Sequence, residues 1–123
     1  MTISGTGSSG LLLARGAEEL FSQAVRLAGT YTFTSFLDCR NSRRILIRVI
    51  STLDQDLIIQ LQGSLVDSAA AATDINGPFA CPAGGIVDIG LADDDWHPYI
   101  GATMTLALAP TVGALTAWGV KQE

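Results

Sequence analysis

The chain has 123 residues and a net charge of −5, with 48% hydrophobic and only 15% charged residues. Its length fits one domain. Its acidic balance argues against nonspecific binding to nucleic acid or to an anionic membrane surface, because both require basic surface. With so few charged residues, a monomer would expose much apolar surface. Two interpretations follow: partners or other subunits cover part of this surface, or the chain is a soluble β-sandwich rich in small residues.

Residues 1–15 open with the Gly- and Ser-rich sequence MTISGTGSSG. Such a composition buries too little apolar surface to order itself, so we predict a flexible N-terminal arm over 1–15 and one folded domain over 16–123. A short arm of this kind can add a strand to a partner. The N-terminus lacks the basic and apolar regions of a signal peptide, so synthesis in the cytoplasm is expected.

Residues 11–27 allow two interpretations. Their apolar residues have helical spacing, but Gly16 interrupts it, and the alternation expected of a strand is poor. We predict extended chain to about Gly16 and a strand from about Glu19 to Leu27, with one helical turn as the alternative. The Thr- and aromatic-rich segment Thr30–Leu37 is a further predicted strand.

The segment Arg43–Ser64 organises the predicted fold. It contains two runs in which apolar residues recur at every second position, as expected of half-buried strands. We predict that these strands form a hairpin whose tight turn lies at Ser51–Gln55, which contains the turn former Asp54. The residues expected on the buried faces are Ile45, Ile47 and Val49 in the first strand and Leu57, Ile59 and Leu61 in the second.

Residues 65–85 are predicted to be a long connection with a short helical turn at Ala69–Ala72. The breakers Asn76-Gly77-Pro78 and Pro82 to Gly85 support this interpretation. Three more strands are predicted at Ile86–Leu91, Tyr99–Leu108 and Ala114–Val120. About seven strands without a long helix indicate an all-β fold, a single antiparallel β-sandwich or jelly-roll-like domain.

The two cysteines, Cys39 and Cys81, are too few for a zinc ribbon. They can form a disulfide if the fold brings them together, and two reduced, buried thiols are the favoured state.

Catalytic chemistry has one candidate centre, the single histidine His97, with Asp95 as a residue that could orient it. Nucleophilic catalysis also needs a nucleophile in a recognisable activated context, and the sequence shows none. A lone His beside a Trp in a loop is more often a surface or packing residue. We therefore expect no enzymatic activity.

The loop Asp93–Pro98 contains three adjacent acids and Trp96, and Tyr99 follows it directly. Calcium sites need acids at alternating positions, so Asp93 to Asp95 indicate a solvated loop, and we expect no metal and no cofactor. Trp96 and Tyr99 could stack on a sugar ring, as in a carbohydrate-binding module, or close one end of the sandwich.

The order of these pieces resembles the small β-sandwich head-decoration (cement) proteins of tailed bacteriophages. The resemblance spans most of residues 20–120. It rests on the strand ending in Gln62-Gly63-Ser64, the late strand entered through Trp96 to Tyr99, and a closing hairpin from Ala109 to Val120.

The resemblance implies a non-enzymatic virion protein that binds and stabilises the outside of the assembled capsid. Its partners would be the major capsid protein and other copies of the chain, with a trimer favoured and a dimer possible. The residues proposed for these contacts are Ile3, Leu11, Leu12, Arg15, Arg40, Arg43, Arg44 and Arg48, with Trp96 and Tyr99 as interface or glycan aromatics. The alternatives are another virion part (a head–tail connector, tail or baseplate protein) and a carbohydrate-binding module.

Overall fold

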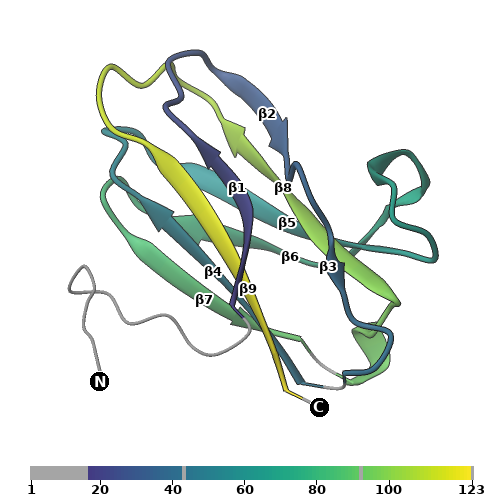
Figure 1. Ribbon diagram of the computed structural model, residues 1–123. Helices are drawn as coiled ribbons and strands as arrows, with labels where there is room; N and C mark the ends of the chain where they lie inside the picture. Colours follow the sequence, from purple (N-terminus) through teal and green to yellow (C-terminus); the bar gives the residue numbers. More distant parts are fainter. Residues whose placement is uncertain (1–16, 43, 92, 123) are drawn as a thin grey trace, which may run out of the picture.

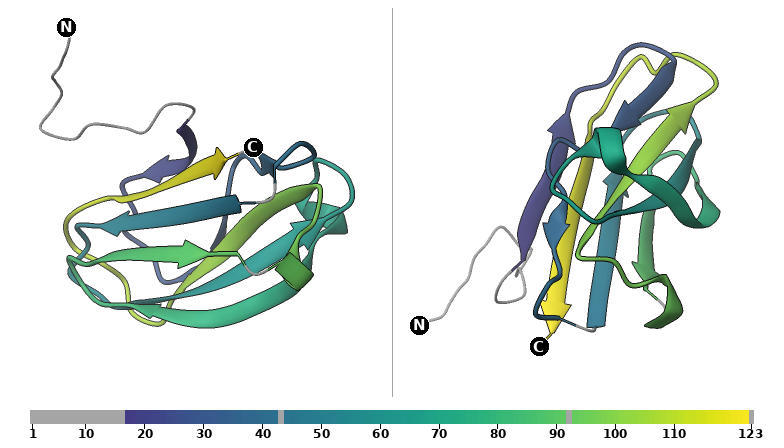
Figure 2. Two further views of the ribbon diagram at one scale, coloured as in Figure 1. Left: turned by 90° about the horizontal axis from the view of Figure 1, so that it is seen from below. Right: turned by 90° about the vertical axis from the view of Figure 1, so that its right-hand side faces the viewer.

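Two antiparallel sheets pack face to face in the computed structural model, which describes residues 17–42, 44–91 and 93–122 (Figure 1, Figure 2). The strands are β1 (Glu18–Gln23), β2 (Gly29–Thr32), β3 (Leu37–Asp38), β4 (Arg44–Ser51), β5 (Leu57–Ser64), β6 (Thr73–Cys81), β7 (Ile86–Gly90), β8 (Tyr99–Leu106) and β9 (Leu115–Gln122). Two short 3₁₀ turns, η1 (Ala69–Ala71) and η2 (Asp93–Asp95), interrupt the loops. Within these ranges, no helix has the length and apolar character needed to cross a membrane.

The strand order is that of a jelly roll. The first sheet has the order β1-β9-β4-β7, and the second has the order β2-β8-β5-β6. The short strand β3 also pairs with β8, further along the side of β8 that β2 occupies. Apart from β3, eight strands therefore form two four-stranded layers in the arrangement that double-sheet jelly rolls adopt. The prediction of an all-β, jelly-roll-like sandwich is confirmed.

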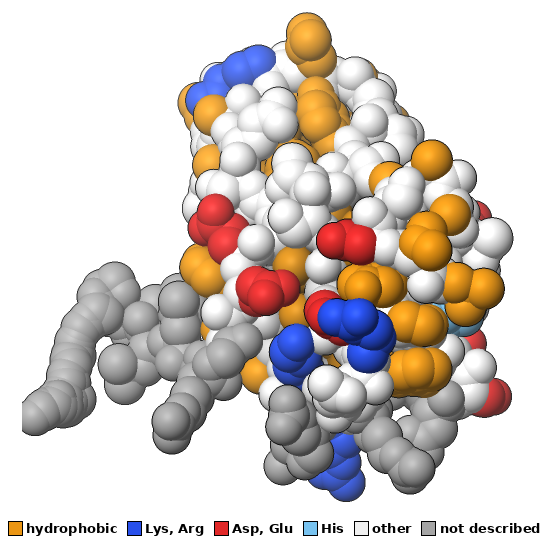
Figure 3. Space-filling model, turned by 45° about the vertical axis from the view of Figure 1, so that its right-hand side comes forward, with side chains coloured by type: hydrophobic (Ala, Val, Ile, Leu, Met, Phe, Trp, Pro, Cys, Tyr) orange, Lys and Arg blue, Asp and Glu red, His pale blue; other side chains and the backbone are white. Residues whose placement is uncertain are grey.

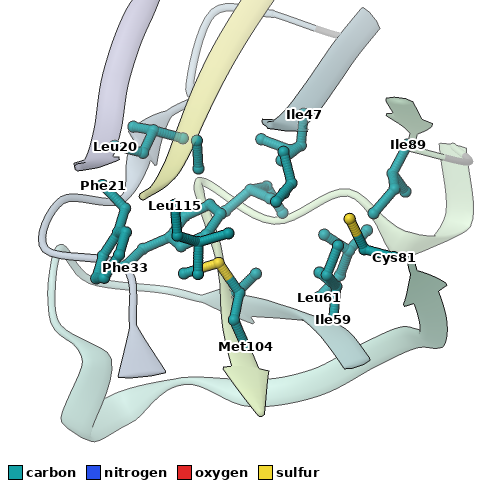
Figure 4. Close-up of a cluster of buried hydrophobic side chains, with 14 of the residues drawn as sticks. Leu20, Phe21, Phe33, Ile47, Ile59, Leu61, Cys81, Ile89, Met104 and Leu115 are labelled. Atoms are coloured by element: carbon teal, nitrogen blue, oxygen red, sulfur yellow. The ribbon is translucent and has the colours of Figure 1, made fainter. Parts of the chain in front are cut away.

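Alternating side chains of both sheets fill the core. The predicted inward residues of β4 and β5 are all at most 5% exposed. Figure 4 shows Ile47 pointing from β4 toward Ile59 and Leu61 of β5, with Met104 of β8 and Leu115 of β9 in the same cluster. The period of two thus identified the buried faces correctly, because each inward side chain meets the opposite sheet.

The predicted hairpin Arg43–Ser64 is wrong in its pairing. β4 pairs with β7 and β9 in the first sheet, whereas β5 pairs with β6 and β8 in the second. The turn at Ser51–Gln55 therefore crosses from one sheet to the other. The closing hairpin predicted for Ala109–Val120 fails in the same way, because β8 and β9 also lie in different sheets. Alternation defines the face of a strand and does not identify its neighbours.

The largest missed strand is β6, which was expected to be part of a connection. Gly77 and Pro78 lie inside it, at the edge of the second sheet, where the pairing with β5 shifts register around Leu61. An edge strand tolerates a residue without an N–H group, because its outer side has no ladder to complete. The described residues therefore form nine strands, where about seven were expected.

The N-terminal strands also end earlier than expected. β1 stops at Gln23, so the strand alternative holds for this segment but does not reach Leu27. The segment Thr30–Leu37 is divided into β2 and β3, because the chain between them turns toward β1. There, the backbone N–H groups of Thr34 and Ser35 donate to the Leu20 carbonyl at 3.0 and 3.2 Å.

Both cysteines are free and buried. Burial raises the pKa of the Cys39 thiol to about 12 and also raises that of Cys81. The thiolate is the reactive form, so neither side chain is suited to nucleophilic chemistry at neutral pH. The expected burial of both thiols is confirmed.

Candidate functional site

Three connections come together at one end of the sandwich, which we call the loop end: residues 39–42 after β3, 65–72 after β5 and 93–98 before β8. The pairing places them there, because Tyr99 at the start of β8 lies opposite both Asp38 and Ser64. β1 begins and β9 ends near this same end (Figure 1). The aromatic and basic residues singled out in the loops of the sequence therefore meet in space.

Arg40 is held at the loop end by Asp38. Its Nε and Nη2 groups donate to the two carboxylate oxygens at 3.0 and 2.7 Å, and its backbone N–H donates to Oδ1 at 3.1 Å. The guanidinium also lies 5.6 Å from the centre of the Tyr99 ring. The charge of Arg40 is thus largely balanced within the chain, while its exposed planar group remains available for contact.

The Arg40 contact predicts that the Asp38 carboxyl stays ionised in moderate acid. Hydrogen bonds from Arg40 lower the pKa of Asp38 from 3.8 to about 2. This pKa is lower in the folded state, so the stabilisation is fully present above about pH 4 and is lost as pH falls toward 2. Substitution Arg40→Gln should move the midpoint back toward 3.8 in an NMR titration of the Asp38 carboxyl carbon. An unchanged midpoint would contradict the assignment, and Arg44→Gln serves as the control.

Trp96 connects two loops of this end. Its indole N–H lies 3.1 Å from the Cys39 carbonyl oxygen and 2.8 Å from that of Ser42, and the residue is 38% exposed. The polar end of the ring is therefore committed to the β3–β4 connection, and part of the ring faces solvent. This geometry fits a residue that holds two loops together at an interface better than an unattached ring on which a sugar stacks.

His97 packs on the backbone of β5 instead of forming a catalytic pair. A Cβ atom on Gly63 would lie 2.4 Å from the imidazole ring, so glycine makes room for the ring at this position. Nδ1 of His97 lies 2.9 Å from the backbone carbonyl oxygen of Asp95, not from its carboxylate. The hypothesis that the Asp95 carboxylate orients His97 as a general base therefore lacks the hydrogen bond that it requires.

Leu65 and Val66 are functional candidates that the sequence analysis missed. They are 76% and 52% exposed, although the loop that carries them is ordered by its own hydrogen bonds. Ser64 Oγ donates to the Val66 carbonyl at 2.6 Å and accepts from the Val66 N–H at 3.2 Å, and Ser68 caps η1. Figure 3 shows apolar side chains gathered beside basic and acidic ones on one face of the molecule. The sequence offered one signal of this surface: two large apolar residues, Leu65 and Val66, stand between the polar residues Ser64 and Asp67.

The arginines of β4 lie on the outer face of the first sheet, away from this apolar surface. Arg44 is exposed at the start of β4. Arg48 forms an ion pair with Asp88 of β7, with Nε–Oδ1 and Nη2–Oδ2 distances of 2.6 and 2.7 Å. The Arg48 hydrogen bonds lower the pKa of Asp88. The predicted contact residues Ile3, Leu11, Leu12, Arg15 and Arg43 lie outside the described residues.

The described residues contain no candidate metal site. No group of three or more His, Cys, Asp or Glu residues there could hold an ion. Asp93 to Asp95 form the turn η2, which leads into Trp96.

No protein-family model and no curated protein sequence matches the chain. Among solved structures, the PBSX exported protein XepA shares the fold with a TM-score of 0.61 at 14% identity, over 98% of this chain and 41% of XepA. A chain of the naturally occurring empty particles of cowpea mosaic virus has a TM-score of 0.52 at 6% identity, over 90% of this chain and 85% of that one. PirA has a TM-score of 0.50 at 12% identity, covering 89% and 97%. At these identities the likeness shows a common fold, and this chain spans less than half of XepA.

Proposed function

We propose that this chain is a non-enzymatic structural protein of a phage virion that binds and stabilises the exterior of the assembled capsid. The observation that carries the proposal is the loop end, where exposed apolar side chains stand beside an arginine and two aromatic residues. Aromatic residues and arginine are enriched at protein interfaces. The jelly-roll order of the strands, which a chain of cowpea mosaic virus particles shares, supports a role in a virus particle.

In this proposal, the loop end faces the major capsid protein. Leu65 and Val66 would enter apolar pockets on the capsid, because they are the large exposed side chains of an ordered loop. Arg40, Trp96 and Tyr99 would surround them and contribute planar and polar contacts. The contact made by each copy would be small, and an oligomer that places several such contacts on the lattice at once would be strongly retained through multivalency.

The N-terminal arm would provide the second capsid contact. Residues 1–15 lead into β1, which begins near the loop end. The Gly- and Ser-rich sequence suits a segment that becomes ordered as an added strand on a partner. Ile3, Leu11 and Leu12 would supply apolar contacts there, and Arg15 a basic one.

The direct test is co-sedimentation of the purified protein with empty capsids assembled from the major capsid protein of the same phage. We expect saturable retention in the capsid pellet, and cryo-electron microscopy should place the density on the outer surface. Retention on tails or connectors alone would favour the alternative virion roles. Recovery of all the protein in the supernatant would contradict the proposal.

Deleting Met1–Gly10 is expected to weaken capsid retention about tenfold or more without changing the melting temperature. The segment precedes the first described strand, so its removal takes no side chain out of the observed core. The measurement is a capsid-binding isotherm beside a thermal melt. Ile3→Ser in the full-length chain is the matched control for the apolar contact. An isotherm identical to that of the intact protein would exclude the arm as an anchor.

A further inference from the structure

The chain contains two asparagines, Asn41 and Asn76, and only Asn76 is followed by glycine. An asparagine loses its side-chain amide when the backbone nitrogen of the next residue attacks the side-chain carbonyl carbon. Glycine in that next position has no side chain to obstruct the attack. The reaction in a folded protein also requires that the attacking N–H is not held by a backbone carbonyl. The structure determines which of the two sites meets this second requirement.

Asn76 and Gly77 lie where β6 is irregular. The pairing with β5 places Asn76 opposite Leu61 and Phe79 opposite Ile59, and it gives Gly77 no partner. The ladder is interrupted there, as it is in a β-bulge. The Gly77 N–H donates to Oδ1 of Asn76 at 2.9 Å. The attacking nitrogen therefore lies directly against the amide group that it would displace.

Gln60 of β5 holds this irregular segment in place. Its Nε2 group donates to the backbone carbonyl of Asn76 at 2.7 Å and to that of Leu61 at 3.1 Å. In the described sheet β6 is an edge strand, and Gly77 is exposed, so water has access to the site. The contact between the Gly77 N–H and the Asn76 amide is thus a stable feature of the folded chain.

Asn41 has the opposite combination. Its side chain lies in an exposed residue, whereas Asn76 is half-buried. However, the N–H of the next residue, Ser42, donates to the Cys39 carbonyl at 3.1 Å, and Ser42 is 4% exposed. Attack on Asn41 requires this bond to open first. Exposure therefore predicts that Asn41 reacts first, and the availability of the backbone nitrogen predicts that Asn76 does.

We propose that Asn76 is a site of spontaneous deamidation in the folded protein. The Gly77 nitrogen forms a bond to Cγ of Asn76, and the Cγ–Nδ2 bond breaks. The proton of the Gly77 N–H leaves with the amide nitrogen as ammonia, and a succinimide ring remains. Water then opens the ring at either carbonyl and leaves aspartate or isoaspartate. Each product adds a negative charge to the strand that carries Asp74, and isoaspartate also lengthens its main chain by one carbon.

The first test compares the full-length protein in mildly alkaline buffer with the same protein unfolded in urea. Peptide mass spectrometry gives the rate at which each asparagine becomes an acid. Folding should slow Asn76 less than about tenfold, and it should slow Asn41 by about tenfold or more, because the Ser42 hydrogen bond must open. Equal protection of the two sites by folding, or stronger protection of Asn76, would overturn the proposal.

The second test gives both sites the same local sequence. Ser42→Gly makes each asparagine precede a glycine, so the two rates should be similar in urea. In the folded variant Asn76 should still react about tenfold faster, because the N–H of residue 42 remains bonded to Cys39. Equal rates in the folded variant would contradict the role of the bulge. The first comparison needs no substitution, so it decides the proposal even if this variant does not fold.

Discussion

Capsid retention should fall at least 30-fold when Leu65 is replaced by aspartate, with no loss of folding stability. Leu65 is 76% exposed, so the substitution removes no core packing. If its side chain anchors the loop end in an apolar pocket, a carboxylate there costs a hot-spot contact of about 2 kcal/mol or more. If copies bind as a linked oligomer, each subunit repeats the loss, and the effect on avidity should exceed that for one isolated contact.

The measurement is a capsid co-sedimentation isotherm, with a thermal melt of each variant to show that the fold is intact. Val112→Asp introduces the same charge at an exposed apolar position in the β8–β9 connection, at the far end of the sandwich. That variant should bind as the wild type does. Equal retention of the Leu65→Asp variant and the wild type would exclude the loop end as the capsid-binding surface.

Gly113→Ala should be the most destabilising glycine-to-alanine substitution among the glycines that the structure describes. Gly113 has a φ of +93°, and a Cβ there would lie 2.0 Å from the carbonyl oxygen of Thr52. The neighbour is backbone, and the Thr52 N–H donates to the Ala114 carbonyl at 2.9 Å, so it has little freedom to move. Backbone strain and overpacking together should cost about 3–5 kcal/mol and lower the melting temperature by about 12 °C or more.

The variant Gly84→Ala separates backbone strain from overpacking. Gly84 also has a positive φ, of +66°, but a Cβ added there would meet no atom within 4 Å. Its substitution should cost only the backbone strain, about 1–2 kcal/mol. Urea unfolding of both variants gives the comparison directly. Equal free energies of unfolding would show that the β8–β9 connection moves away from Thr52 at little cost.

The candidate site was only partly predictable. Arg40, Trp96 and Tyr99 were recognised as contact candidates, because planar and aromatic residues in loops are visible in the sequence. Leu65 and Val66 were missed, because exposure depends on how the β5–β6 loop leaves the sheet. The separation of Arg48 from Arg40 was also missed, although only seven residues intervene, because one lies on the outer face of the first sheet and the other on the loop end.

The sequence by itself determined the all-β class and the buried face of each central strand. Both follow from the period of two, which is a local property: Ile47 and Ile59 point inward whichever strands lie beside them. Only the tertiary structure decided which strands pair. The turn after β4 was expected to close a hairpin, yet β4 pairs over its whole length with β9, whose partner residues lie about 65–80 positions away in sequence. Such pairing depends on the registers that two packed sheets can satisfy together, and no local pattern contains that information.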